Sequence, residues 1–157
     1  MEHAFVLLLL PAALLLAGCS APAEQAANDP QEPAEPQSDL EMLQGKWKPV
    51  SMKQDGEFLA KERIDKTRLT IEGENFTFET ANDSHGGLYK IAPEKDPKEL
   101  DIVITRGDEE GKVYLVIYKF EDGQMVQCME VSNENRPSEF TGEKGSGNLL
   151  EYWERVE

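Results

Sequence analysis

The sequence predicts an all-β fold: a small, up-and-down antiparallel barrel of about eight strands, with a short helical turn at its N-terminal end. Three observations lead to this prediction. After residue 38, the chain consists largely of strand-length runs in which apolar and polar residues alternate. Turn signals rich in Gly, Asp and Asn separate these runs at short intervals. No long apolar stripe with helical periodicity interrupts the series.

The domain is expected to open with a helical turn. Ser38-Asp39-Leu40-Glu41 has the spacing of a capping box, and Gly45 is a helix stop signal. A second helical turn is expected within residues 60–65. Eight strands are predicted, in order, at residues 46–54, 67–72, 75–80, 88–91, 100–104, 113–120, 124–131 and 149–156.

Most connections between these strands are expected to be short. Asp55-Gly56 and Asp122-Gly123 are tight-turn dipeptides, whereas residues 82–87 and 132–148 are predicted to be loops. Sequential antiparallel strands of this number close well into a barrel, which removes exposed sheet edges. A flattened sandwich is the competing all-β solution, and periodicity alone does not separate the two.

Alternation also predicts which side chains point into the barrel. The inward set is bulky and comprises Leu69, Ile71, Phe76, Phe78, Leu100, Ile102 and Ile104. We therefore expect at most a small interior pocket, below the ~300 Å³ typical of ligand sites, with function lying on the surface. Residues 113–120 are apolar on both faces, so their outer face should be covered by the segment around residues 136–140, by the opening helical turn or by a partner.

The N-terminal segment resembles a lipoprotein export signal. Residues 4–18 are almost wholly apolar but too short to span ~30 Å of hydrocarbon comfortably, which is typical of a signal peptide. The run ends in Leu16-Ala17-Gly18-Cys19, which resembles the bacterial lipobox. This resemblance implies that residues 1–18 are removed and that Cys19 is lipidated. More than one acyl chain on Cys19 would give stable membrane anchoring. The first residues lack a positive side chain, which leaves an uncleaved anchor helix as the alternative.

A linker is expected between the lipid and the domain. Residues 19–38 contain four prolines and no aromatic or β-branched residue, so they cannot bury enough apolar surface to become ordered. The folded domain then spans residues 39–157. The sequence therefore predicts a protein exported to the cell envelope, on the periplasmic or outer-membrane side, whose membrane partner is reached through Cys19.

The domain resembles a known family in several motifs. Gly45-Lys46-Trp47 on the first strand matches the lipocalin Gly-x-Trp signature. Segments further along occur in the order expected of an uncharacterised, planctomycete-type lipocalin-like domain family, among them Phe76-Thr77-Phe78 and Gly145-Ser146-Gly147. The resemblance implies a fold but no activity. It also implies that Arg155 on the closing strand stacks on the indole of Trp47 and so closes one end of the barrel.

Two further segments stand out against that family. The most recognisable motif is Arg136-Pro137-Ser138-Glu139-Phe140. We expect a structural role for it, in which Phe140 plugs an end of the barrel while Arg136 and Glu139 hold the loop. The final strand departs from the family, because Leu150-Glu151-Tyr152-Trp153-Glu154 is more aromatic and acidic than expected.

Composition excludes several functional classes. The chain holds 31 acidic and 16 basic residues, a net charge of −15, and such a surface repels nucleic-acid phosphates. Only His3 and His85 are present, so no His-rich metal site is expected. Asp83, Ser84 and His85 are sequence neighbours, which rarely reach triad geometry. Cys128 lies in an apolar run and is expected to be a buried thiol. We expect no catalytic residue, metal or cofactor.

The functional expectation is a membrane-tethered, non-catalytic binding or interaction module of the envelope. Its partner is either an envelope protein bound on the surface or a small apolar ligand held inside the barrel. The rival class is an envelope hydrolase that uses carboxylates. A pocket lined by two or more ionisable groups would favour the enzyme, and a dry or apolar interior would favour binding.

Overall fold

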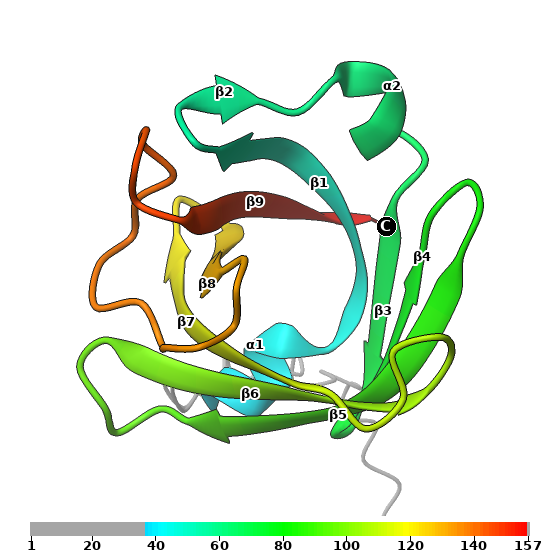
Figure 1. Cartoon of the computed structure of the whole chain (residues 1–157). Coiled ribbons are helices and arrows are strands. Elements are labelled where there is room, and N and C mark those ends of the chain that lie inside the picture. Colours follow the sequence, from blue (N-terminus) through cyan, green and yellow to red (C-terminus); the bar gives the residue numbers. More distant parts are fainter. Residues whose placement is uncertain (1–36, 157) are drawn as a thin grey trace, which may run out of the picture. The chain divides into compact units, whose positions relative to one another are not determined.

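The computed structural model describes residues 37–156, which form a closed antiparallel barrel of eight strands (Figure 1). The elements are α1 (Asp39–Leu43), β1 (Gly45–Gln54), β2 (Glu57–Phe58), α2 (Lys61–Ile64), β3 (Arg68–Glu72), β4 (Asn75–Glu79), β5 (Ser84–Ala92), β6 (Lys98–Arg106), β7 (Val113–Glu121), β8 (Gln124–Glu130) and β9 (Asn148–Val156). Strands β1 and β3 to β9 pair in chain order, and β9 pairs back along the length of β1. This last pairing closes the ring, so the fold is a barrel and not a sandwich.

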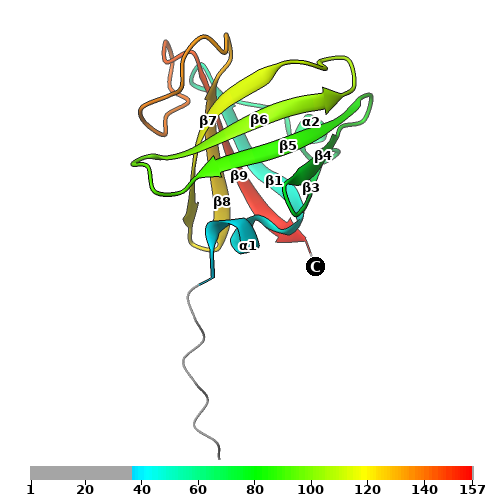
Figure 2. The ribbon, with the colours of Figure 1, turned by 90° about the horizontal axis from the view of Figure 1, so that it is seen from below.

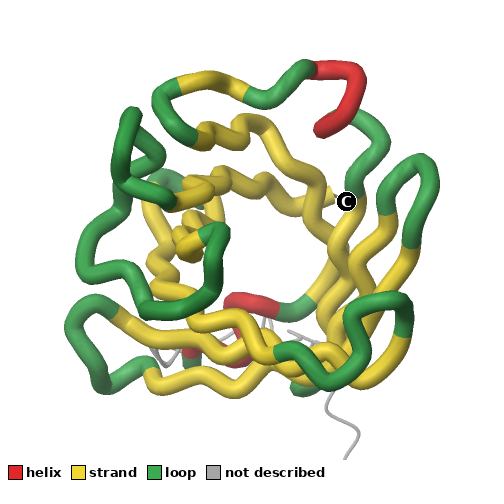
Figure 3. The backbone as a smooth tube through the Cα atoms, viewed as in Figure 1, coloured by secondary structure: helices red, strands yellow, loops and turns green. Residues whose placement is uncertain are grey.

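Strand β2 and helix α2 lie outside the ring, next to β1 (Figure 1). Only Lys53 and Gln54 at the end of β1 pair with the two residues of β2. Figure 3 shows how far strands dominate the chain, with two short helices in the described residues. The predicted helical turn within residues 60–65 is confirmed as α2. Strand β2 was not predicted, because two residues are too few to display an alternating pattern.

Strand β5 is longer than predicted. It begins at Ser84, inside the segment 82–87 that was expected to be a polar loop. Gly86 and Gly87 mark an irregularity in its pairing with β6, and a Cβ atom built on Gly87 would lie 1.8 Å from the carbonyl oxygen of Val103. The two glycines, which suggested a loop, instead permit a close approach of strands at a bulge.

Helix α1 closes one end of the barrel (Figure 2). The predicted capping box is confirmed, because the amide of Ser38 donates to the Glu41 carboxylate at 2.8 Å and the amide of Glu41 donates to Ser38 Oγ. The Tyr118 hydroxyl and Lys98 Nζ both donate to the carboxylate of Asp39, each at 2.7 Å. These contacts tie the first residue of α1 to β7 and β6.

The main core lies inside the barrel. It contains the residues predicted to point inward, with Phe78 packed against them at partial burial. A second, smaller cluster lies on the outer face of β7, β8 and β9 and comprises Ile117, Val126, Cys128 and Leu150, with Phe140 and Tyr152 packed against it. The loop at residues 131–147 covers this outer face. Three covers were considered for the second apolar face of β7, and the structure shows the first of them, the segment around residues 136–140.

The predicted signal peptide (residues 1–18), Cys19 and the linker as far as residue 36 lie outside the described residues. Within residues 37–156, neither helix has the length and apolar character needed to cross a membrane.

Candidate functional site

The Gly-x-Trp signature lies at the end of the barrel that α1 closes. Trp47 is 2% exposed, and its indole Nε1–H donates to the carbonyl of Leu43 at 2.8 Å. Arg155 pairs with Trp47 across β1 and β9, and its guanidinium carbon lies 4.5 Å from the centre of the indole ring. The same guanidinium donates to the carbonyls of Met42 and Gln44. The stacking that the resemblance implied is thus present. The guanidinium of Arg155 also satisfies carbonyl groups at the C-terminal end of α1.

Gly45 has a specific role at this end. Its φ is +111°, a conformation that other residues rarely adopt, and a Cβ atom there would lie 2.8 Å from Arg155 Nη1. Gly45, Trp47 and Arg155 therefore form one structural unit that fastens α1 to the barrel. None of the three lines the interior pocket described below.

Arg136 anchors the long loop to the barrel wall. Its guanidinium donates to the carbonyls of Leu100 and Val116 and to the carboxylate of Asp101, and Pro137 beside it is buried. The role expected for Phe140 is wrong. Phe140 packs on the outer cluster, beneath Lys119, whose Nζ lies 5.0 Å from the ring centre. Phe140 therefore covers part of the outer face of β7, β8 and β9 and does not plug a barrel end.

Glu139 contributes less to the loop than expected. Its side chain is exposed, so of the two charged residues in the motif it is Arg136 that ties the loop down. Beneath this loop, Cys128 is fully buried, and burial raises the pKa of its thiol. The thiol lies 3.5 Å from the carbonyl of Thr141, as expected of an inert, structural cysteine.

The barrel interior contains a pocket of about 350 Å³. Its lining includes Gln54, the last residue of β1, and Leu149 near the start of β9, so it lies toward the end opposite α1. Its volume lies slightly above the upper bound of ~300 Å³ predicted from the bulky inward residues. The bulky inward residues were assigned correctly, but they line the walls of a wide ring and do not meet at its axis.

The deeper wall of this interior pocket combines aromatic rings with one carboxyl group. Phe76 and Tyr89 pack with ring centres 4.9 Å apart, and Phe78 contacts Trp153 edge-on at 6.3 Å. Glu151 on β9 points into the same space and is only 5% exposed. Burial raises the pKa of its carboxyl group to about 7.

Glu151 has few partners. Trp153 Nε1–H donates to Glu151 Oε2 at 3.3 Å, a long hydrogen bond. Its lateral neighbours in the sheet are Met52 on β1 and Gln127 on β8, both uncharged. No lysine, arginine or histidine among residues 37–156 forms an ion pair with it. Glu151 is therefore a buried acid without a cationic partner in the described part of the chain.

His85 lines the same pocket nearer its mouth. Its ring stacks on Phe78 with centres 4.8 Å apart, and its Nδ1 lies 3.6 Å from the carboxylate of Asp83. This nitrogen is buried and has no hydrogen-bond partner among the described residues. Ser84 is exposed and is the partner of Glu79 across the sheet. Because neighbours along a strand point to opposite faces, Ser84 and His85 do not share a face.

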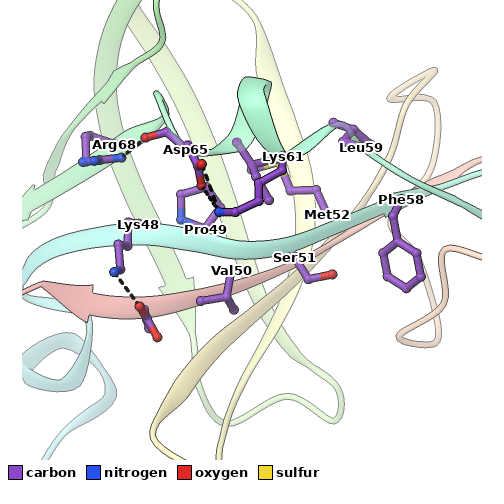
Figure 4. A pocket seen from close by; sticks show the side chains of 12 residues that line it. Lys48, Pro49, Val50, Ser51, Met52, Phe58, Leu59, Lys61, Asp65 and Arg68 are labelled. Carbon is purple, nitrogen blue, oxygen red and sulfur yellow. Dashed lines mark hydrogen bonds and ion pairs between the residues drawn. The ribbon is translucent and has the colours of Figure 1, made fainter.

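A second pocket of about 550 Å³ lies on the flank of the barrel between β1, β2 and α2 (Figure 4). Phe58, 71% exposed, stands at one end of this lateral pocket. Its charged groups already have partners. Lys48 pairs with Glu154 at 2.8 Å, Lys61 pairs with Asp65 at 2.7 Å, and Arg68 donates to the carbonyl of Asp65. The lateral pocket is larger than the interior pocket, but Lys48, Lys61 and Arg68 in its lining already have partners within the chain and are less available to a ligand.

Sequence reasoning missed Glu151, and the signal that pointed to it was present. The acidic and aromatic run at residues 150–154 was recognised as a departure from the family. Alternation on the last strand places Glu151 and Trp153 on one face, and the closed barrel turns that face inward.

No cluster of three or more potential metal-ligating side chains occurs within residues 37–156.

Comparison of the chain with models of protein families, with curated proteins and with solved structures finds no match.

Proposed function

We propose that this protein is a membrane-tethered, extracytoplasmic binding protein that holds a small molecule inside its barrel. The observation that carries the proposal is the interior pocket of about 350 Å³, whose lining combines apolar and aromatic side chains with polar and ionisable groups that include Glu151 and His85. Pockets of this size and composition are the usual sites for small ligands. The lipobox resemblance at Cys19 adds the tether, which would keep the barrel close to a membrane of the envelope.

Retained ligand is the direct test. Native mass spectrometry of the protein purified from its own host should show a small-molecule adduct with one ligand per chain. Leu149→Trp, which fills the pocket mouth, should abolish the adduct. Val50→Trp is the matched control because it places the same bulk in the lateral pocket. Loss of the adduct only in the Val50 variant would move the site to the flank, and an adduct retained by both variants would contradict the proposal.

Binding can also be followed without a host-derived ligand. Trp47 and Trp153 are the two tryptophans of the chain, and only Trp153 lines the interior pocket. In a Trp47→Phe background, the remaining fluorescence therefore reports on the pocket. Ligands that enter the barrel should change this emission saturably, with a stoichiometry of one.

An acid–base enzyme is the second candidate. Glu151, with its pKa raised to about 7, and His85 line one pocket, and this is the feature by which the sequence analysis distinguished an enzyme from a carrier. A carboxyl group with such a pKa can act as a general acid near neutral pH. Turnover of chromogenic ester or glycoside substrates that disappears in Glu151→Gln would favour catalysis. Equal background rates for both proteins would favour binding.

A further inference from the structure

The chemistry of the interior pocket suggests which class of molecule it holds. We propose that the pocket takes a small organic cation, an amine with an apolar or aromatic body, whose ammonium group pairs with the carboxylate of Glu151. This inference rests on the proposed function, because it names the ligand class of the same pocket. It is drawn from the placement of Glu151 among aromatic rings and from the charges around it.

Glu151 lacks a cationic partner among residues 37–156. A buried carboxylate is strongly destabilising unless a cation or several hydrogen bonds compensate for its lost hydration. Glu151 receives one long hydrogen bond, from Trp153, and its neighbours Met52 and Gln127 carry no charge. A ligand that brings a positive charge into the pocket would supply what the described residues do not.

Aromatic side chains form much of the pocket wall. Phe76, Phe78, Tyr89 and Trp153 line the pocket around Glu151. Aromatic faces attract cations, most strongly where water is excluded, and they also pack well against an apolar or aromatic ligand body. A bare metal ion suits this environment poorly, since it requires several oxygen, nitrogen or sulfur ligands.

The other acids that line the pocket, Glu109 and Glu130, already have hydrogen-bond partners within the chain. Glu109 is engaged by Lys112 at 2.7 Å and by the Tyr114 hydroxyl at 2.8 Å. Glu130 accepts the backbone amides of Glu134 and Asn135.

Arg63 and His85 are the two bases in the lining of the interior pocket, and neither forms an ion pair with Glu151. Glu151 is therefore the buried acid of this lining, and it forms no ion pair with a base of residues 37–156, whereas His85 lies 3.6 Å from the carboxylate of Asp83. The domain as a whole carries an excess of acids, which raises the local concentration of cations.

The proposal carries a defined pH dependence. In the ligand-free protein, Glu151 is protonated below about pH 7, because burial raises the pKa of its carboxyl group. An amine then binds only after this proton has been released to water, so amine affinity should fall about tenfold per pH unit below that value and level off above it. Tyr89 faces Glu151 from β5 and stays neutral, since burial raises the pKa of its hydroxyl further above its usual value. The other ionisable groups, at the mouth, are Arg63, His85, Glu109, Tyr114 and Glu130.

The test uses three matched probes on the full chain in detergent, with calorimetry as the readout, or Trp153 fluorescence in the Trp47→Phe background. The probes are 2-phenylethylamine, the neutral 2-phenylethanol and the anionic 3-phenylpropionate. At pH 8, we expect the amine to bind at least tenfold more tightly than the alcohol and the carboxylate to bind weakest. Glu151→Gln keeps the size and shape of the side chain, and it should lower amine affinity at least tenfold while leaving alcohol affinity unchanged.

Glu154→Gln, on the same strand but pointing outward, is the matched control and should leave all three affinities unchanged. Equal binding of amine and alcohol, or amine binding that Glu151→Gln does not weaken, would overturn the ligand class while leaving the carrier function standing. Binding of none of the probes, together with protein from the host that carries no adduct, would overturn both. Unchanged alcohol binding by Glu151→Gln shows that the variant pocket is intact, so a loss of amine binding cannot be attributed to misfolding.

Discussion

At the scale of single residues, Glu151 couples the stability of the barrel to pH. Its folded-state pKa of about 7 lies above the ordinary value of 4.5, so the folded protein holds this proton more tightly than the unfolded chain. The resulting stabilisation is fully present below about pH 4.5 and is lost as the pH rises through 7. A shift of this size corresponds to about 3 kcal/mol.

Glu151→Gln should therefore stabilise the protein at alkaline pH. We expect the free energy of unfolding of the variant to equal that of the parent near pH 4 and to exceed it by about 3 kcal/mol at pH 8. Urea unfolding at several pH values measures the difference, with Glu154→Gln as the exposed control. Parallel stability curves for Glu151→Gln and the parent would mean that Glu151 is not buried as described.

Trp47 is the second residue with a measurable individual effect. It is 2% exposed, donates a hydrogen bond to Leu43 and carries the guanidinium of Arg155. Trp47→Ala should cost about 3–5 kcal/mol, a large part of the stability of a small domain. Trp47→Phe keeps an aromatic surface, so its free energy of unfolding should lie between that of Trp47→Ala and that of the parent. A Trp47→Ala melting temperature within about two degrees of the parent would contradict the packing, because such a change corresponds to less than 1 kcal/mol.

At the scale of elements, the loop at residues 131–147 protects the outer cluster. Arg136 links it to carbonyls on β6 and β7, and Cys128 lies buried beneath it. In a Cys19→Ala background, Cys128 is the only thiol, so its rate of modification by a thiol reagent reports opening of the loop.

Arg136→Ala should speed the modification of Cys128 roughly tenfold, since losing hydrogen bonds of this kind weakens local closure by about 1–2 kcal/mol. Arg136→Lys should restore little of the protection of Cys128, because a lysine ammonium group lacks the planar guanidinium with which Arg136 reaches three acceptors. Glu139→Ala, in the same loop but exposed, is the control and should react like the parent. Equal rates in all variants would show that Arg136 does not hold the loop.

At the scale of the whole molecule, the tether and the barrel are expected to be separable. Cys19→Ala should remove the lipid and release the protein from membranes, because acyl burial supplies the anchoring energy at ~0.8 kcal/mol per methylene. The barrel should keep its unfolding transition, since its strands and core are formed by residues within 37–156. Cys128→Ala is the matched control and should remain on the membrane. Unchanged partitioning of the Cys19 variant would defeat the lipoprotein hypothesis.

Much of the fold follows from local signals in the sequence. Alternation with a period of two assigned Leu69, Ile71 and Phe76 to the interior because a strand has only two faces. The capping box at Ser38 and Glu41 located α1 through interactions that span four residues. Asp55-Gly56 and Asp122-Gly123 located turns, because both dipeptides tolerate positive φ.

Tertiary structure alone decided the rest. Whether the strands close into a ring depends on the pairing of β1 with β9, a contact between the two ends of the domain that no local pattern encodes. The same pairing turns Glu151 and Trp153 inward and sets the interior volume, which depends on how far opposite walls stand apart rather than on which residues face inward. It also places Arg155 over Trp47, whereas Phe140 lies on the outer face because it packs there against the second apolar cluster.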